Sequence, residues 1–77
     1  MEAVPEIVAL RLSHLKAQTA AQQGALHLAV QQYLVCLERA ERRQDPACMA
    51  YFAERLCECY TRMGLPDKAK AYKELAR

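Results

Sequence analysis

The chain has 77 residues, a formal net charge of +2, two glycines and three prolines. This length allows one small domain and excludes a large buried active site. A net charge of +2 is too small to indicate binding to nucleic acid, and none is expected. No apolar run approaches the roughly 18 residues of a membrane span, so no direct membrane insertion is expected. No secretory signal follows Met1, and an intracellular, cytoplasmic location is the simplest interpretation.

The composition and the apolar spacing predict an all-α fold, beginning with a helix from about residue 5. Val8, Leu12, Leu15 and Thr19 form the expected apolar stripe of this first helix, with Leu10 and Ala17 beside them. Gly24 follows the helix and is suited to a left-handed residue at its end.

A second helix is predicted to run through about residue 42, and it has the clearest two-sided pattern in the first half of the chain. Its stripe consists of Leu26, Ala29, Val30, Tyr33, Leu37 and Ala40.

Asp45 and Pro46 indicate a capped start for a third helix, which ends at Gly64. Pro66 starts a fourth helix, which we expect to end with the chain. We expect two stacked antiparallel hairpins, at about residues 5–43 and 45–77, that form a single domain of a longer chain. The apolar stripe of the third helix consists of Met49, Phe52, Ala53, Leu56, Cys57, Tyr60 and Met63, and that of the fourth consists of Ala69, Tyr72 and Ala76.

The second hairpin resembles a tetratricopeptide repeat, a unit of about 34 residues. The first hairpin is less similar, because Lys16 stands where a large apolar residue is usual and Ala20 where an aromatic is usual. The resemblance implies a protein-interaction adaptor or scaffold with a peptide-binding groove. The matching residues are Ala53, Leu56, Cys57, Tyr60, Gly64, Asp67, Ala69, Tyr72 and Ala76.

Two alternatives remain open. Gly24, Leu26, Ala29 and Tyr33 resemble a pattern of the three-helix MIT domains, which implies binding to helical tails of membrane-remodelling, endosomal proteins. MIT domains have no fourth helix opened by a turn such as the one at Gly64. The other alternative is a helical oligomerisation element.

The four cysteines do not have the spacing of a zinc site. Cys57 and Cys59 would point about 200° apart around a helix, so they cannot bind one ion while the helix persists. Cys36 and Cys57 lie in apolar stripes and are predicted to be buried thiols. Cys48, in the first turn of the third helix, is predicted to be the most reactive, because the helix dipole lowers a thiol pKa.

No catalytic constellation is present in the sequence. His14 and His27 have no carboxylate or cysteine at the spacing of a ligand pair or catalytic dyad, and the isolated Gly24 and Gly64 form no phosphate-binding loop. We therefore expect no enzyme activity, no metal and no cofactor.

The tetratricopeptide resemblance implies a groove between the first and third helices that holds a partner segment. Chaperone-binding members of that family hold a carboxylate with Lys and Asn, whereas this chain has Glu54 and Glu58 there, so we expect a neutral or basic partner. The implied binding residues are Arg11, His14, Gln18, Gln22, Tyr51, Glu54, Glu58, Thr61 and Arg62.

The fourth helix is not followed by another that could cover its apolar face. Three outcomes are expected: the chain belongs to a longer array, this helix packs back on the first helix, or its face mediates self-association or partner binding.

Overall fold

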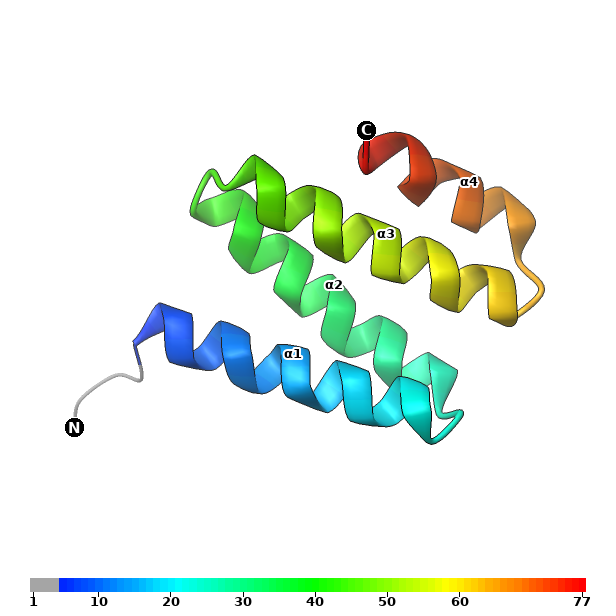
Figure 1. Ribbon diagram of the computed structural model, residues 1–77, viewed down its shortest axis with the longest axis horizontal. Helices are drawn as coiled ribbons and strands as arrows, with labels where there is room; N and C mark the ends of the chain where they lie inside the picture. Colours follow the sequence, from blue (N-terminus) through cyan, green and yellow to red (C-terminus); the bar gives the residue numbers. More distant parts are fainter. Residues whose placement is uncertain (1–4) are drawn as a thin grey trace.

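The computed structural model describes residues 5–77, and these residues form four α-helices without a strand (Figure 1). The helices are α1 (Glu6–Gln22), α2 (Leu26–Arg42), α3 (Pro46–Arg62) and α4 (Pro66–Leu75). The all-α prediction is confirmed, and each predicted segment corresponds to one helix.

The helices recur with a fixed period. They begin at Glu6, Leu26, Pro46 and Pro66, so the spacing between successive starts is the same throughout. The long second helix expected from the sequence is present, because α2 ends at Arg42. Each position in α1 therefore corresponds to a position in α3, as Glu6 corresponds to Pro46. In the same way, positions in α2 correspond to positions in the last segment of the chain, which contains α4.

The three turns share one hydrogen-bonding pattern. After α1, the Ala25 amide donates to the Ala20 carbonyl at 2.9 Å, and the corresponding distances are 3.1 Å after α2 and 2.9 Å after α3. This six-to-one bond defines the Schellman motif, which needs a left-handed residue after the helix. Gly24 (φ 79°), Gln44 (φ 53°) and Gly64 (φ 76°) supply it.

The main helix–helix contacts join consecutive helices, so α1 and α4 lie at opposite ends of the molecule (Figure 1). One expectation for the fourth helix is wrong, because α4 does not pack back on α1. Its apolar side instead packs on α3, where the Tyr60 and Tyr72 rings stack with centroids 5.5 Å apart.

The core combines small and large side chains. Ala17, Ala29 and Ala40 are fully buried and allow α1 and α2 to approach closely, and Leu56 of α3 is the largest fully buried side chain. The other buried residues are Leu10, Ala20, Val30, Tyr33, Cys36, Leu37, Phe52, Ala53, Cys59, Tyr60 and Ala69.

The predicted stripe of the first helix is wrong in orientation. Val8, Leu12, Leu15 and Thr19 face outward, and Val8, Leu12 and Leu15 are 42%, 51% and 60% exposed. The buried side of α1 instead consists of Leu10, Ala17 and Ala20. α1 carries apolar residues on both sides, and α2 packs on the side where alanines permit close approach.

Candidate functional site

A groove of about 280 Å³ lies between α1 and α3. Both helices border the same face of α2, so their side chains meet across it although few backbone contacts join them. We call this the α1/α3 groove. Its lining residues are Leu10, Arg11, His14, Ala47, Cys48, Tyr51 and Phe52.

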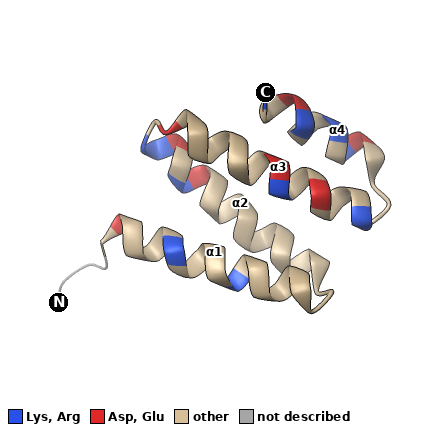
Figure 2. Cartoon of the chain, viewed as in Figure 1, with Lys and Arg blue, Asp and Glu red and all other residues tan. Residues whose placement is uncertain are grey.

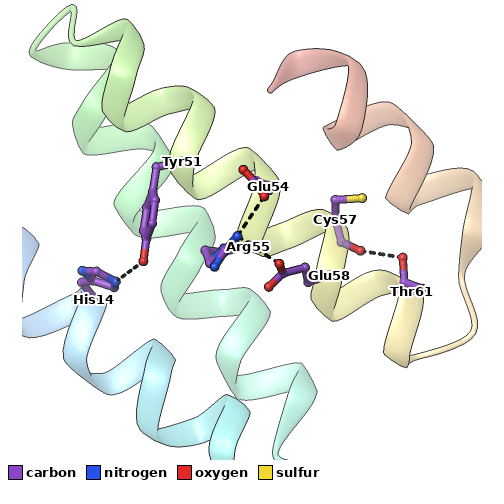
Figure 3. Close-up of polar contacts among 7 residues, drawn as sticks. All are labelled: His14, Tyr51, Glu54, Arg55, Cys57, Glu58 and Thr61. Carbon is purple, nitrogen blue, oxygen red and sulfur yellow. Dashed lines mark hydrogen bonds and ion pairs between the residues drawn. The ribbon is translucent and has the colours of Figure 1, made fainter. Parts of the chain in front are cut away.

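Three rings form the centre of the α1/α3 groove. The His14 Nε2 atom lies 3.3 Å from the Tyr51 hydroxyl, within hydrogen-bonding distance (Figure 3). The His14 ring also meets Tyr51 and Phe52 edge to face, with centroid distances of 5.4 and 5.3 Å. Such edge-to-face pairs are favourable, so they position the exposed Tyr51 ring beside the groove.

The groove keeps His14 neutral at neutral pH. Partial burial lowers the pKa of His14 below its ordinary 6.5, and the nearby Arg55 guanidinium lowers this pKa further. A neutral imidazole can either accept a hydrogen bond from the Tyr51 hydroxyl or donate one to it, depending on which ring nitrogen carries the proton.

Arg55 organises the acidic side of α3. Its guanidinium lies 3.1 Å from a Glu54 carboxylate oxygen and 2.9 Å from one of Glu58, and it also lies 5.1 Å from the centre of the Tyr51 ring (Figure 3). Arg55 thus links the aromatic groove to the two glutamates. The three charged side chains together carry a net charge of −1.

Five of the binding residues implied by the resemblance lie in two neighbouring hollows, and the other four lie elsewhere. Arg11, His14 and Tyr51 line the α1/α3 groove, whereas Glu54 and Glu58 border a hollow shared with α4. The predicted site is therefore brought together only in part.

The remaining predicted residues have other surroundings. The Thr61 hydroxyl donates to the Cys57 carbonyl at 2.8 Å, and Thr61 lines the space between α3 and α4. The Arg62 guanidinium donates to the Ala21 carbonyl at 3.2 Å, which joins the end of α3 to the end of α1. Gln18 and Gln22 are exposed on α1, outside the lining of the groove.

Sequence reasoning missed Phe52, Cys48 and Arg55 as members of the site. Phe52 was assigned to the core stripe, because apolar residues at helical spacing indicate core as readily as groove, and Cys48 was predicted only as a reactive thiol. Arg55 did have a signal, since this cation stands one residue after Glu54 and three residues before Glu58 on one helix.

The cysteines differ from expectation in two respects. Cys36 and Cys59 are the buried thiols, whereas Cys57 is only half-buried. Burial raises the pKa of Cys36 to about 11 and also raises that of Cys59. The lowered pKa predicted for Cys48 is wrong in direction, because hydrogen bonding to the neighbouring Asp45 carboxylate raises the pKa of this thiol. The rank of Cys48 among the four thiols in reactivity stays a prediction.

Residues 5–77 contain neither a cluster of metal ligands nor a membrane-spanning helix. In this part of the chain, no three His, Cys, Asp or Glu side chains are grouped so that they could bind an ion. None of the described helices has both the length and the apolar character needed to cross a membrane.

Comparisons with protein-family models, with curated proteins and with solved structures found no match.

Proposed function

We propose that this chain is a protein-interaction module, without catalytic activity of its own, that binds a neutral or basic segment of a partner protein in the α1/α3 groove. The observation that carries the proposal is the ring cluster of His14, Tyr51 and Phe52, which lines a groove between two helices. Grooves lined by aromatic side chains with a few polar groups are typical of peptide-binding sites.

The charges around the groove support a neutral or basic segment. Glu54, Arg55 and Glu58 carry one net negative charge beyond Tyr51, and a lysine or arginine of the segment would be attracted there. Arg11 at the other end would favour a neutral or acidic residue. The segment is thus expected to carry its basic residue on the side of Glu54 and Glu58.

The family assignment is part of the proposal. The residue types of the second hairpin favour a tetratricopeptide-like module, although the hairpins recur at a longer period than the roughly 34 residues of that family. An MIT-like module that binds helical tails of membrane-remodelling proteins is the alternative, and the presence of α4 is its main difference from that pattern.

A peptide library displayed on phage and selected against the whole chain provides the test. We expect selected peptides to contain Lys or Arg and to bind Tyr51→Ala more weakly by about tenfold, since an anchoring aromatic contact is worth more than about 1 kcal/mol. Glu54→Lys combined with Glu58→Lys should also weaken binding, whereas Leu34→Gln, an exposed apolar position of α2 outside the groove, serves as the control.

Selected peptides that bind wild type and Tyr51→Ala equally would contradict the proposed site. A selection that yields no binding peptide would contradict the proposed function.

A further inference from the structure

Because the helices are evenly spaced in sequence, the residues on the outer side of α1 correspond in position to residues on the buried side of α3. Phe52 and Leu56 of α3 are buried, and the corresponding positions of α1 are Leu12 and Lys16, which are both exposed. The difference in burial has a simple cause, because α3 has α2 packed against this side. α1 begins the described series of helices and has nothing there.

This outward side of α1 is mainly apolar, and we call it the α1 outer face. Leu12 and Leu15 are more than half exposed, and Leu28 of α2 is 50% exposed beside them. A crevice of about 330 Å³ runs between Leu15 and Leu28. The α1 outer face consists of Val8, Leu12, Leu15, Lys16, Thr19 and Leu28.

The other end of the molecule has the opposite character. Val30, Tyr33 and Leu37 of α2 are buried, and their counterparts in the last segment of the chain are Lys70, Lys73 and Arg77. These three cations line a groove of about 650 Å³ between α3 and α4, together with Glu74. Figure 2 shows basic positions in blue along α4. A polar outer surface suits the last helix of a stack. The α1 outer face has no such protection.

We propose that the α1 outer face binds an amphipathic helix of a partner protein, and that this helix presents leucine-like side chains together with a carboxylate opposite Lys16. The proposal is independent of the peptide site proposed above, because no residue of the α1 outer face lines the α1/α3 groove.

The charge of this region identifies the chemistry of the partner. Between Ile7 and Leu37 the chain has two cations, Arg11 and Lys16, and no carboxylate. Lys16 occupies the position of the fully buried Leu56, so a helix docked as α2 docks on α3 would cover the ammonium group. A covered charge is tolerated only when it is paired, and a carboxylate on the partner supplies the pair.

A second copy of this chain does not meet that requirement. In a head-to-tail stack that repeats the internal period, Lys16 of one copy would face Lys70, Lys73 and Arg77 of the next, and the one carboxylate in that groove lining, Glu74, leaves this surface net positive. In a two-fold arrangement, the α1 outer faces would bring only cations together. Both arrangements oppose like charges, which disfavours association.

An anionic membrane surface is a weaker fit. The α1 outer face contains no Trp, Tyr or Phe, the residue types that anchor helices at the membrane interface. Two cations give little attraction to anionic lipid, at about 1 kcal/mol each. The crevice beside Leu15 and Leu28 is instead suited to a side chain projecting from a packed helix.

The test uses two labelled synthetic helices, matched in length to α2, that share one leucine stripe and are flanked in one peptide by Glu and in the other by Lys. Fluorescence anisotropy with the whole chain should show that the Glu peptide binds at least about tenfold more tightly. Lys16→Glu should reverse this preference, and Leu12→Gln with Leu15→Gln should weaken binding at least about tenfold. Leu75→Gln, an exposed apolar residue of α4, is the matched control.

Circular dichroism checks that the variants fold, which we expect because the substituted side chains are exposed. Any of four results would overturn the proposal. These are failure of both peptides to bind, equal binding of the two peptides, an unchanged preference in Lys16→Glu, and an equal loss in Leu75→Gln.

Two further measurements test whether a second copy of the chain or a lipid membrane, and not a partner helix, binds the α1 outer face. Sedimentation velocity of the chain alone would reveal a dimer, and its disappearance in the Leu12→Gln, Leu15→Gln variant would assign the α1 outer face to a second copy. Sedimentation with phosphatidylserine vesicles would reveal membrane binding, and vesicle binding without discrimination between the peptides would assign it to lipid. Either result would replace the partner helix.

Discussion

The two ends of the molecule expose opposite kinds of side chain on their open sides. α1 and α4 each have a neighbour on one side only, yet the open side of the α4 end carries Lys70, Lys73 and Arg77 whereas the open side of α1 carries Leu12 and Leu15. The three cations correspond to buried positions of α2, and Leu12 corresponds to the buried Phe52 of α3. The α4 end thus presents charged residues to water, and this difference supports the proposal that the α1 end binds a partner helix.

The comparison also shows what a register position contributes. An apolar side chain contributes several kcal/mol to the free energy of unfolding when a neighbouring helix covers it, and almost nothing when it faces water. The reason is that hydrophobic stabilisation depends on the apolar area removed from water. The following predictions test this difference between equivalent positions, beginning with the largest effect.

The largest effect is expected at the pair Leu56 and Lys16. Leu56→Ala removes a fully buried side chain and should cost about 3 kcal/mol of unfolding free energy, enough to unfold most of a domain this small. Lys16→Ala, at the equivalent exposed position, should cost less than about 0.5 kcal/mol. Urea denaturation followed by circular dichroism measures both. Equal losses would show that the two positions have similar surroundings, contrary to the comparison.

The second test gives α4 apolar side chains at two positions where α2 has them. Lys70→Leu with Lys73→Leu places apolar side chains where α2 has Val30 and Tyr33. We expect this variant to self-associate at concentrations where wild type is monomeric, because it exposes a new apolar surface. Sedimentation velocity over a concentration series gives the readout, with Lys70→Gln and Lys73→Gln as the polar control. A double-leucine variant that stays monomeric would mean that cations at this end do not protect it.

The third test compares the turns. Gly24→Ala and Gly64→Ala place a side chain at φ 79° and 76°, with open space around the new Cβ, so the cost is conformational and should be about 1 kcal/mol in each. Gln44→Gly, at φ 53°, should be neutral or slightly stabilising. Thermal unfolding compares the three variants. A much larger loss in one glycine variant would show that the turns are not energetically equivalent.

The smallest effect concerns pH and the α1/α3 groove. The folded protein lowers the pKa of His14, so the unfolded chain binds this proton more readily. The contribution to stability is fully present above the unfolded pKa of 6.5 and is lost as the pH falls from there through the lower folded pKa. Urea midpoints at pH 7.5 and 5.5 should therefore differ less in His14→Gln than in wild type. Gln18→Ala, at an exposed position of the same helix, is the control and should keep the wild-type dependence.

The helices and their boundaries were predictable from sequence because their signals are local. Gly24, Gly64 and the Asp45–Pro46 pair mark turns and starts through backbone conformation and hydrogen bonding within a few residues. The turn at Gln44 shows the limit, since a non-glycine residue adopts φ 53° there and the capping residue that follows carried the signal.

The buried side of α1 was not predictable, because periodicity identifies an apolar stripe but not its neighbour. Val8, Leu12 and Leu15 make the more hydrophobic stripe, yet Ala17 and Ala20 face α2 because small side chains permit close packing. The candidate site was found in part for a related reason. The tetratricopeptide resemblance placed Tyr51 and His14 on facing helices, but it did not reveal that Glu54 and Glu58 pair with Arg55 and border a hollow shared with α4.

The most direct measurement of the difference between the two ends is a map of amide chemical shifts while the Glu-flanked helical peptide is titrated into the whole chain. The account predicts that the shifts concentrate on α1 from Val8 to Thr19 and around Leu28, and that Lys70, Lys73 and their neighbours on α4 stay unchanged. Shifts centred on α4, or spread evenly over both ends, would contradict the proposal that the α1 end, and not the α4 end, binds a partner helix.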